Sequence, residues 1–394
     1  MVTYMADQSF SEWLRETRRD FHAHPELAFM EIRTTEKILK ILKEYGVEAE
    51  PITDLTGCVG MIYGNSEGPT LGLRADIDAL PITEMNELPY KSVYPGKMHA
   101  CGHDANTTVM LGVARKIMET DIYKHMRGNV KLLFQPAEEG AKGARKMIDK
   151  GVLDNPRVHR VIAGHMTPDL NVGTAGIFRG IGYASSDTIV LRIIGTGGHG
   201  ARPEEGNDPI VAGAHFVTAI QSIVSRNVKP TEAGVVTIGK FVSGSSPNII
   251  PRVVEIEGSI RALSEYVRSL ILRRIKEIVN GIQHMFSVTC EFEIHEGVPV
   301  LVNDVDVADS LYDAAQRTLG RGNAFFLPPV MGSEDFVFFT LERPSAIMRF
   351  GCGNREKGLI SPLHSPYFNI DEDALDFAVE IILQAVKDYL AREG

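Results

Sequence analysis

The chain has 394 residues, with 41 basic and 51 acidic side chains and a formal net charge of −10. This length exceeds what a single hydrophobic core usually supports, so we expect two domains. The basic residues are scattered among acidic ones, which excludes the basic footprint of a nucleic-acid-binding protein. No apolar run reaches membrane-spanning length and the first residues lack a signal-peptide pattern, so we expect a soluble, unexported protein that does not bind a membrane.

The number and spacing of the cysteines indicate the redox state of the compartment in which the protein works. The four cysteines are too few and too dispersed for a disulfide framework; they are Cys58, Cys101, Cys290 and Cys352. Disulfides are rare where thiols are kept reduced. The composition therefore favours a cytoplasmic protein.

The first part of the chain predicts alternating helices and strands. Apolar residues recur at helical spacing in some segments, and short apolar runs bounded by turn residues form others. The expected helices cover residues 9–22, 31–45, 105–118 and 141–150, and the expected strands cover 58–63, 70–75, 129–135 and 160–164. Such short, almost continuously apolar strands are typical of a mostly parallel sheet buried on both faces and flanked by helices.

The pattern changes near residue 185. The next expected elements are a strand over 187–194, a helix over 209–225, strands over 234–242 and 253–262, a helix over 265–285 and a strand over 288–295. This βαββαβ order is that of a ferredoxin-like α+β unit. The α/β pattern then returns, with a helix over 305–319, a strand over 346–350 and a helix over 371–391. We therefore expect a catalytic α/β domain at 1–183 and 298–394, with an inserted domain at 184–297.

Residues 99–103 contain two histidines and a cysteine at a spacing that is typical of metal ligands. If this segment is extended, alternation directs His99, Cys101 and His103 to one side. Imidazole and thiolate suit a divalent ion such as zinc, but the site needs further ligands from elsewhere. A buried cysteine between two polar neighbours explains the same pattern, so the local sequence leaves both interpretations open.

Further ligand-type side chains follow other predicted strands. Acidic or imidazole groups come directly after the strands near residues 75, 135 and 164, at the carboxyl ends where open α/β sheets place their sites. The candidate ligands are Cys101, His103, Glu139, His165 and His364. Five ligands exceed the need of one tetrahedral ion and suit two metals that share a bridging group. Glu138 lies beside Glu139, and one of the two can bind metal while its neighbour stays free to act as general acid and base.

Five motifs together resemble a known family. They are 73–81 (LRADIDALP), 98–104 (MHACGHD), 134–140 (FQPAEEG), 197–200 (GGHG) and 363–366 (LHSP). They resemble the aminoacylase and carboxypeptidase clan of dinuclear metallohydrolases. Within it they are most similar to the amidohydrolase branch of hippurate hydrolases, indole-acetyl-amino-acid hydrolases and N-acetyl-diaminopimelate deacetylases.

The resemblance implies roles for the metal-site residues. The five candidate ligands would bind two divalent ions (zinc, manganese, cobalt or nickel), with Cys101 as the bridge. Glu138 would deprotonate a water that bridges the metals and return the proton to a leaving nitrogen. Asp78 either orients a ligand imidazole, which we prefer, or only caps the following turn.

The resemblance also implies roles for the inserted domain. It would be a lid and a dimerisation domain, giving a homodimer or a higher homo-oligomer. His199 would reach a neighbouring subunit's site and hold the developing oxyanion. Asn248 matches a position that contacts substrate. Arg261 is a candidate clamp for a substrate carboxylate, or alternatively pairs with Glu255 or Glu257.

Three positions depart from the branch's usual pattern. Asn106 stands where histidine is frequent, which puts a supporting role for that position in doubt. Arg202 and Glu204 follow the His199 turn, where a Pro-His pair is frequent, and could change which substrates are accepted. Asp335 lies in a further stretch that matches the family, although a helix N-cap would explain it almost as well.

The sequence thus predicts a metal-dependent amidohydrolase that cleaves an N-acyl amino acid, such as an N-acetyl or N-benzoyl derivative, to a carboxylic acid and an amino acid. A dipeptidase or carboxypeptidase on the same dinuclear site is an alternative. A thiol hydrolase with Cys101 as nucleophile is another, but it leaves Glu139, His165 and His364 without a role. A catalytically silent protein on this scaffold is disfavoured because every ligand and Glu138 are present.

Overall fold

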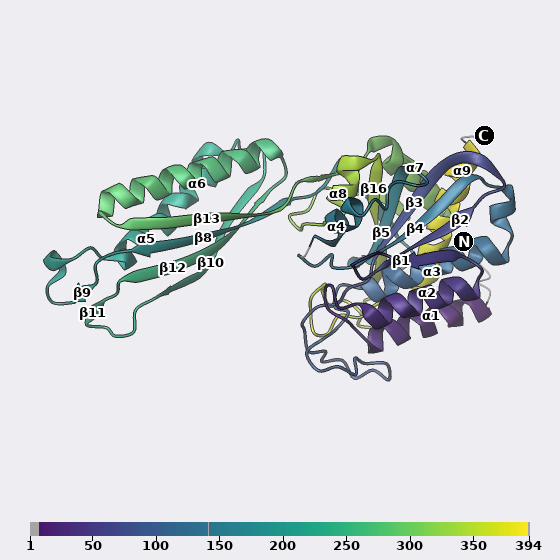
Figure 1. Ribbon diagram of the computed structural model, residues 1–394, viewed down its shortest axis with the longest axis horizontal. Coiled ribbons are helices and arrows are strands. Elements are labelled where there is room, and N and C mark those ends of the chain that lie inside the picture. The colour runs from purple at the N-terminus through teal and green to yellow at the C-terminus, as the bar shows by residue number, and fades with distance from the viewer. Residues whose placement is uncertain (1–7, 141, 393–394) are drawn as a thin grey trace. The chain divides into compact units, whose positions relative to one another are not determined.

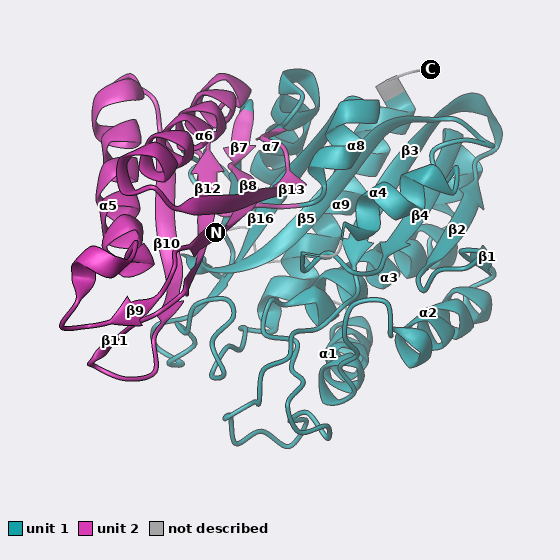
Figure 2. Ribbon diagram, turned by 60° about the vertical axis from the view of Figure 1, so that its left-hand side comes forward, with its two compact units in different colours: residues 1–180, 302–328, 335–394 teal, residues 181–301, 329–334 magenta. Residues whose placement is uncertain are grey.

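The computed structural model describes residues 8–140 and 142–392, which fall into two units (Figures 1 and 2). Unit 1 contains residues up to 180 together with 302–328 and the residues from 335 onward. Unit 2 contains residues 181–301 and the short segment 329–334. Among the described residues, every helix is too short or too polar to cross a membrane.

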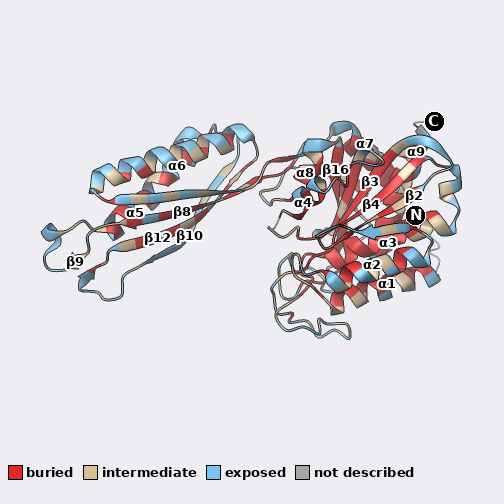
Figure 3. Ribbon diagram, in the orientation of Figure 1, coloured by how far each residue is buried: buried red, intermediate tan, exposed pale blue. Residues whose placement is uncertain are grey.

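Unit 1 is built on an eight-stranded sheet with the order β1-β2-β4-β3-β5-β16-β6-β15. These strands are β1 (Glu48–Pro51), β2 (Cys58–Tyr63), β3 (Ser66–Asp76), β4 (Arg127–Gln135), β5 (Val158–Asn171), β6 (Ala175–Ile177), β15 (Ala324–Phe326) and β16 (Ser345–Gly353). The central strands β4, β3, β5 and β16 are mutually parallel. β4 and β16 are almost entirely buried, and so are the second half of β3 and the middle of β5 (Figure 3), as expected for a sheet covered on both faces.

Helices flank this sheet. They are α1 (Gln8–Ala23), α2 (Ile32–Glu44), α3 (His103–Glu119), the 3₁₀ turn η1 (Ile122–His125), α4 (Gly143–Asp149), α7 (Val305–Leu319), α8 (Val337–Glu342) and α9 (Asp373–Arg392). Each long helix turns an apolar stripe toward a common core, as Ile38, Ile41 and Leu42 of α2 illustrate. The mixed α/β fold with a mostly parallel sheet is confirmed.

Unit 2 has a four-stranded antiparallel sheet with the order β10-β12-β8-β13. Its elements are β7 (Ile181–Tyr183), β8 (Ser185–Ile194), β9 (Gly198–His199), η2 (Pro203–Glu205), α5 (Pro209–Ser222), the π-helical turn η3 (Ile223–Asn227), β10 (Gly234–Ser243), β11 (Ile249–Ile250), β12 (Val253–Ala262), α6 (Glu265–Phe286) and β13 (Thr289–Val298). The short strand β14 (Leu301–Val302) pairs with β7.

The helices of unit 2 begin where the sequence provides caps. The Asp208 carboxylate accepts the N–H of Ile210 ahead of α5, and the Ser264 hydroxyl accepts the N–H of Val267 ahead of α6. The apolar faces of both helices, with Phe216 in α5, are buried in a core of their own. The order of the main elements confirms the βαββαβ prediction.

A buried ionic network joins α1 to the start of α3. The Arg18 side chain is fully buried, and its Nε donates to Asp104 Oδ2 at 2.8 Å. His22 Nδ1 lies 2.8 Å from the same oxygen, and its Nε2 lies 3.2 Å from Glu84 Oε1. Removing one member of a buried pair leaves the other as an unpaired buried charge. We therefore expect this network to matter more for stability than the ion pairs at the surface.

Replacing Arg18 with methionine should lower the free energy of unfolding by about 3–5 kcal/mol, because the buried Asp104 carboxylate loses its guanidinium partner and keeps only His22. Arg15 is a matched control, since it lies on the same helix and pairs with Asp373, but the two side chains are 33% and 54% exposed. Arg15→Met should change stability by at most about 1 kcal/mol. Urea denaturation followed by circular dichroism measures both variants, and equal effects would contradict this view of the network.

Candidate metal centre

The structure brings all five predicted ligands together in unit 1. The ligand atoms of Cys101, His103 and His165 lie within 4.8 Å of one another, and so do those of Cys101, Glu139 and His364. The two sets share Cys101, whose Sγ lies 3.6 Å from His165 Nε2. Two adjacent ligand sets with one member in common are the arrangement that two bridged metal ions require.

The backbone at Gly102 gives Cys101 and His103 their positions. Gly102 has φ of 81°, a left-handed conformation that suits glycine, and its carbonyl accepts the N–H groups of Ala105 and Asn106. Helix α3 therefore begins at His103, and the prediction of an extended segment from His99 to His103 is wrong. His99 is instead buried, and neither of its ring nitrogens has a hydrogen-bond partner among the described residues. Burial lowers the pKa of this imidazole to about 4.

His103 is oriented by Asp78. Its Nδ1 lies 2.9 Å from the Asp78 carbonyl oxygen and 3.2 Å from Asp78 Oδ1, so Nδ1 carries the proton. Its Nε2 is buried and has no hydrogen-bond partner among the described residues. An imidazole nitrogen left with a free lone pair inside a Cys/His/Glu cluster fits a metal ligand. The predicted role of Asp78 is consistent with this geometry.

His165 lies within β5, because that strand continues past the predicted end to Asn171. Its Nδ1 donates to the Met166 carbonyl at 2.7 Å, which leaves Nε2 toward Cys101. Asn106 supports this arrangement: its Oδ1 accepts the Met166 N–H at 3.0 Å and its Nδ2 donates to Asp76 Oδ1 at 2.8 Å. The asparagine that departs from the branch's pattern thus connects α3, β3 and β5 beneath the ligands.

Glu138 and Glu139 follow β4 in a turn that begins at Ala137, a residue with φ of 53°. The Glu139 N–H donates to Asp78 Oδ2 at 3.0 Å, so Asp78 holds both a ligand ring and a ligand backbone. A Glu138 carboxylate oxygen lies within 4.8 Å of ligand atoms of His103 and Glu139. Glu138 is therefore beside the ligand cluster, as a general base would need to be.

His364 completes the cluster from a loop. Its N–H donates to the Ala100 carbonyl at 2.8 Å, and its Nε2 lies 3.3 Å from Glu139 Oε1. Hydrogen bonds to Cys101 and Glu139 raise the pKa of His364 to about 10. These two neighbours thus favour a positive charge at this position, which also fits a metal site.

A second buried network lies under Glu138, and the sequence did not reveal it. The Asp335 carboxylate accepts from Arg74 Nη2 at 3.1 Å and from Gln135 Nε2 at 2.8 Å, and it also accepts the Ala144 N–H. The Asp335 N–H donates to Glu138 Oε1 at 3.3 Å. Helix α8 begins only at Val337 and has no side-chain cap, so the N-cap interpretation of Asp335 is wrong.

His199 and Asn248 belong to unit 2 and are neighbours there. The two-residue strands β9 and β11 pair, and the Gly200 N–H donates to the Asn248 carbonyl at 2.9 Å. His199 Nδ1 accepts the Ala201 N–H, so a neutral ring carries its proton on Nε2. The ring is exposed and its Nε2–H is available as a donor.

Arg261 lies half-buried on β12, also in unit 2, and burial lowers its pKa. Glu255 lies near Arg192 and Glu257 pairs with Lys240, so the predicted alternative in which these acids pair with Arg261 is wrong. Within the described residues, no hydrogen bond or ion pair engages the Arg261 guanidinium. Asp187 acts electrostatically on Arg261 but is itself hydrogen-bonded by Arg268, so the Arg261 guanidinium keeps unused donors for an anionic group.

The two residues that follow the His199 turn remain at the surface. Arg202 lies 3.4 Å from Glu205 in an exposed pair, and Glu204 is exposed in η2. Their effect on substrate choice stays a prediction.

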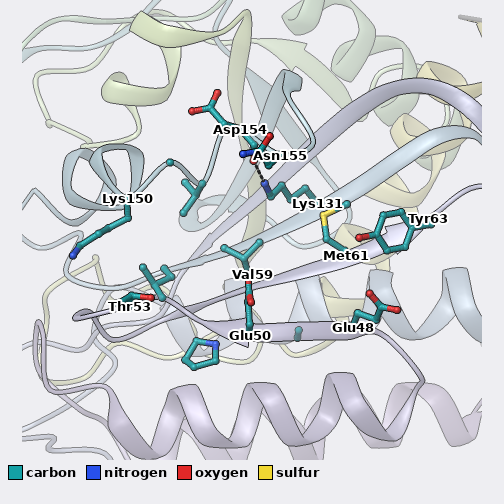
Figure 4. Close-up of a pocket in the computed structure, with 15 residues that line it drawn as sticks. Glu48, Glu50, Thr53, Val59, Met61, Tyr63, Lys131, Lys150, Asp154 and Asn155 are labelled. Carbon is teal, nitrogen blue, oxygen red and sulfur yellow. Dashed lines mark hydrogen bonds between the residues drawn. The ribbon is translucent and has the colours of Figure 1, made fainter.

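A groove of about 520 Å³ lies elsewhere in unit 1, along β1, β2 and β4 (Figure 4). Lys131 lies in it and donates from Nζ to the Asp154 carbonyl at 2.6 Å. None of the predicted site residues lines this groove, so it is separate from the metal centre.

A family model described as peptidase family M20/M25/M40 matches residues 72–388. The chain belongs to this family. An N-acetyl-L-cysteine deacetylase of Bacillus subtilis (strain 168) is 39% identical over 373 residues, which cover 95% of this chain and 87% of that protein. Thermostable carboxypeptidase 1 of Saccharolobus solfataricus is 36% identical, with 96% of each chain covered.

Solved structures show the same relationship. A dinuclear metal binding peptidase of the M20 family from Bacillus subtilis superimposes with a TM-score of 0.84 at 32% identity, covering 98% of this chain and 99% of that one. The recognised family and the hydrolase class are confirmed. The family's dinuclear metal binding suggests two divalent ions, which the two ligand sets around Cys101 fit.

Replacing Asp78 with alanine should weaken divalent-metal binding by about 10-fold to 100-fold, because the Glu139 N–H loses its acceptor and the His103 ring keeps only the carbonyl of residue 78 as acceptor. Asp169 is the control, since it lies on the same strand as His165 but its side chain is 74% exposed. Asp169→Ala should keep the wild-type affinity. Competition with a chromophoric chelator measures all three proteins, and unchanged binding in Asp78→Ala would contradict the assigned role.

Proposed function

We propose that this M20 protein is a metal-dependent amidohydrolase that cleaves the amide bond of an N-acyl amino acid to a carboxylic acid and a free amino acid. The observation that supports it best is the position of Glu138. This carboxylate lies against two ligand sets that share Cys101 and is held by a backbone N–H from Asp335. A base beside a dinuclear site is what hydrolysis of an unactivated amide needs.

Cys101, His103, Glu139, His165 and His364 would hold the two ions. When bound, divalent ions supply Lewis acidity toward a carbonyl oxygen and lower the pKa of water toward neutrality. The mixed thiolate, imidazole and carboxylate donors suit zinc, manganese, cobalt or nickel, because such donor sets do not select among these ions by chemistry alone.

Glu138 would move the proton. It accepts a proton from the attacking water and returns it to the leaving nitrogen, which must become an amine to depart. The Asp335 N–H on Oε1 holds the carboxylate through this cycle. Cys101 as a nucleophile is a weaker proposal, since the residue is only 8% exposed and lies among the other ligands.

Unit 2 would supply groups that recognise the substrate. The Nε2–H of His199 can donate to an oxyanion, and Asn248 lies beside it. The unpaired Arg261 guanidinium suits the carboxylate that every N-acyl amino acid carries. The same clamp would hold the C-terminal residue of a peptide, and because a relative is named a carboxypeptidase, peptidase activity is the second candidate function.

Unit 2 would also mediate assembly into a homodimer or higher homo-oligomer. Strand β10 is an edge of its sheet and carries exposed Val235, Phe241 and Val242. An exposed apolar edge strand is unfavourable in water unless another chain covers it. A second copy of unit 2 would allow His199 to serve the partner's site, as the resemblance implies.

The free cysteines, including the ligand Cys101, are consistent with a reducing compartment such as the cytoplasm.

Glu138→Gln should bind metal like the wild type but lose at least about 100-fold in kcat, because the amide cannot take a proton. Glu139→Gln is the matched variant one residue away and should lose metal as well as activity. Elemental analysis and amine release from a panel of N-acetyl, N-benzoyl and N-succinyl amino acids measure both. Wild-type turnover in Glu138→Gln would refute the proposed role.

Mixing two inactive variants tests whether His199 acts across subunits. In a dimer of one His199→Ala and one Glu138→Gln chain, one site has an intact Glu138 and receives an intact His199 from the partner. An equimolar, re-equilibrated mixture should therefore recover about a quarter of wild-type activity. If His199 acts within its own chain, the mixture should stay as inactive as the single variants.

A further inference from the structure

A buried carboxylate outside the ligand cluster contacts the turn that carries Glu138. Glu31 is fully buried, and its Oε1 accepts the Ala137 N–H at 2.9 Å. Its Oε2 accepts the Thr56 hydroxyl at 2.5 Å. None of the roles described above uses Glu31.

Glu31 directly precedes α2 but does not cap it. Its side chain makes no capping hydrogen bond. Glu26 serves the helix instead, because its carboxylate accepts the N–H groups of Arg33 and Thr34 at 3.2 and 2.8 Å. The carboxylate of Glu31 is therefore directed at Ala137 for a reason other than the start of α2.

The residue that Glu31 contacts has an unfavourable backbone conformation. Ala137 has φ of 53°, in the left-handed region that residues with a Cβ disfavour. Its N–H is held by Glu31 and its carbonyl accepts the Gly143 N–H at 3.0 Å. Since Ala137 precedes Glu138, its backbone conformation sets the direction in which the Glu138 side chain leaves the chain. Strain of this kind persists only when surrounding contacts enforce it.

We propose that Glu31 is a positioning residue that fixes the left-handed conformation of Ala137 and so aims the Glu138 carboxylate at the metal centre. This inference rests on the proposed role of Glu138. The turn is then anchored at three successive points: Ala137 by Glu31, the Glu138 carboxylate by the Asp335 N–H, and the Glu139 N–H by Asp78. Because the first anchor contacts no ligand, its loss should misdirect the base and leave the ligands in place.

The environment of Glu31 supports a role beyond packing. Burial raises the pKa of its carboxyl to about 6, so the fold keeps an acid where ionisation is disfavoured. An apolar residue there would leave the Ala137 N–H without its acceptor inside the protein.

Three variants separate positioning from stability. Glu31→Ala removes the acceptor and should lower kcat by about 10-fold to 100-fold, the effect of a small displacement of a reacting group. Its KM and metal content should stay within about two-fold of wild type, because the ligands have other anchors. Glu31→Gln keeps an oxygen that can accept the Ala137 N–H, so it should recover most of kcat. Glu26→Ala, which weakens the same helix without touching the turn, should lower the melting temperature and keep kcat.

Hydrogen exchange provides a readout that does not depend on activity. The amides of residues 137–140 should exchange faster in Glu31→Ala than in wild type, and at the wild-type rate in Glu26→Ala. If Glu31→Ala does not fold, Glu31→Asp tests the proposal instead. Its side chain keeps the carboxylate but is one methylene shorter, so the oxygen no longer reaches the Ala137 N–H. Its kcat should then fall below that of Glu31→Gln.

Wild-type kcat in Glu31→Ala or Glu31→Asp would overturn the proposal, and so would a loss of metal that parallels the loss of activity. Failure of the proposed function has a different signature: the wild type itself would release no amine from any substrate. In that case the amide exchange of residues 137–140 still decides whether Glu31 fixes the turn.

Discussion

The site depends on the register of three parallel strands. Asp76 at the end of β3 pairs with Gln135 at the end of β4, and Arg74 pairs with Ala163 of β5. This register places the residues that follow β3 and β4 level with His165. The segments that carry Asp78, Glu139 and His165 therefore converge at the carboxyl ends of these strands: Asp78 accepts the Glu139 N–H, and His165 lies beside Cys101. Helix α3 and the His364 loop add the remaining ligands there. A shift of one residue in either pairing would separate them.

The ligands are held by partners that are themselves buried and hydrogen-bonded. Asp78, Asn106 and Asp335 each connect two or more chain segments beneath the site. Buried polar groups are costly unless they are satisfied, and a satisfied network fixes one arrangement. Such networks do not make the fold more stable than an apolar core would, because charges must be desolvated. Their contribution here is the precise direction of the ligands and of Glu138.

Much of this was predictable from sequence, for identifiable reasons. The five ligands and Glu138 follow strand ends or lie in short motifs, and the structure brings the ligands into one cluster with Glu138 beside it. The mostly parallel sheet and the βαββαβ unit followed from apolar periodicity, which is a local signal. The boundaries were less accurate: periodicity did not indicate that Gly102 would start α3 at His103 or that β5 would continue beyond His165.

Most of the residues that hold the ligands and Glu138 in position could not be identified from the sequence. Glu31 lies 106 positions from Ala137 and Asp335 lies 197 positions from Glu138, so no local pattern links them. Asn106 was noticed only as a departure, and its function needed the positions of Asp76 and Met166. Arg261 was ambiguous for a related reason, since only the folded strand shows that Glu255 and Glu257 have other partners. Such roles are defined by tertiary contacts, which a single sequence does not show.

The most direct test of this account is the metal content of the purified protein, measured together with amine release from N-acyl amino acids before chelation, after chelation and after metal is restored. The account predicts about two divalent ions per chain, loss of amine release with the chelator and its return with added metal. Turnover that resists chelation but is abolished by iodoacetamide would contradict it, because Cys101 would then be a nucleophile rather than a metal ligand.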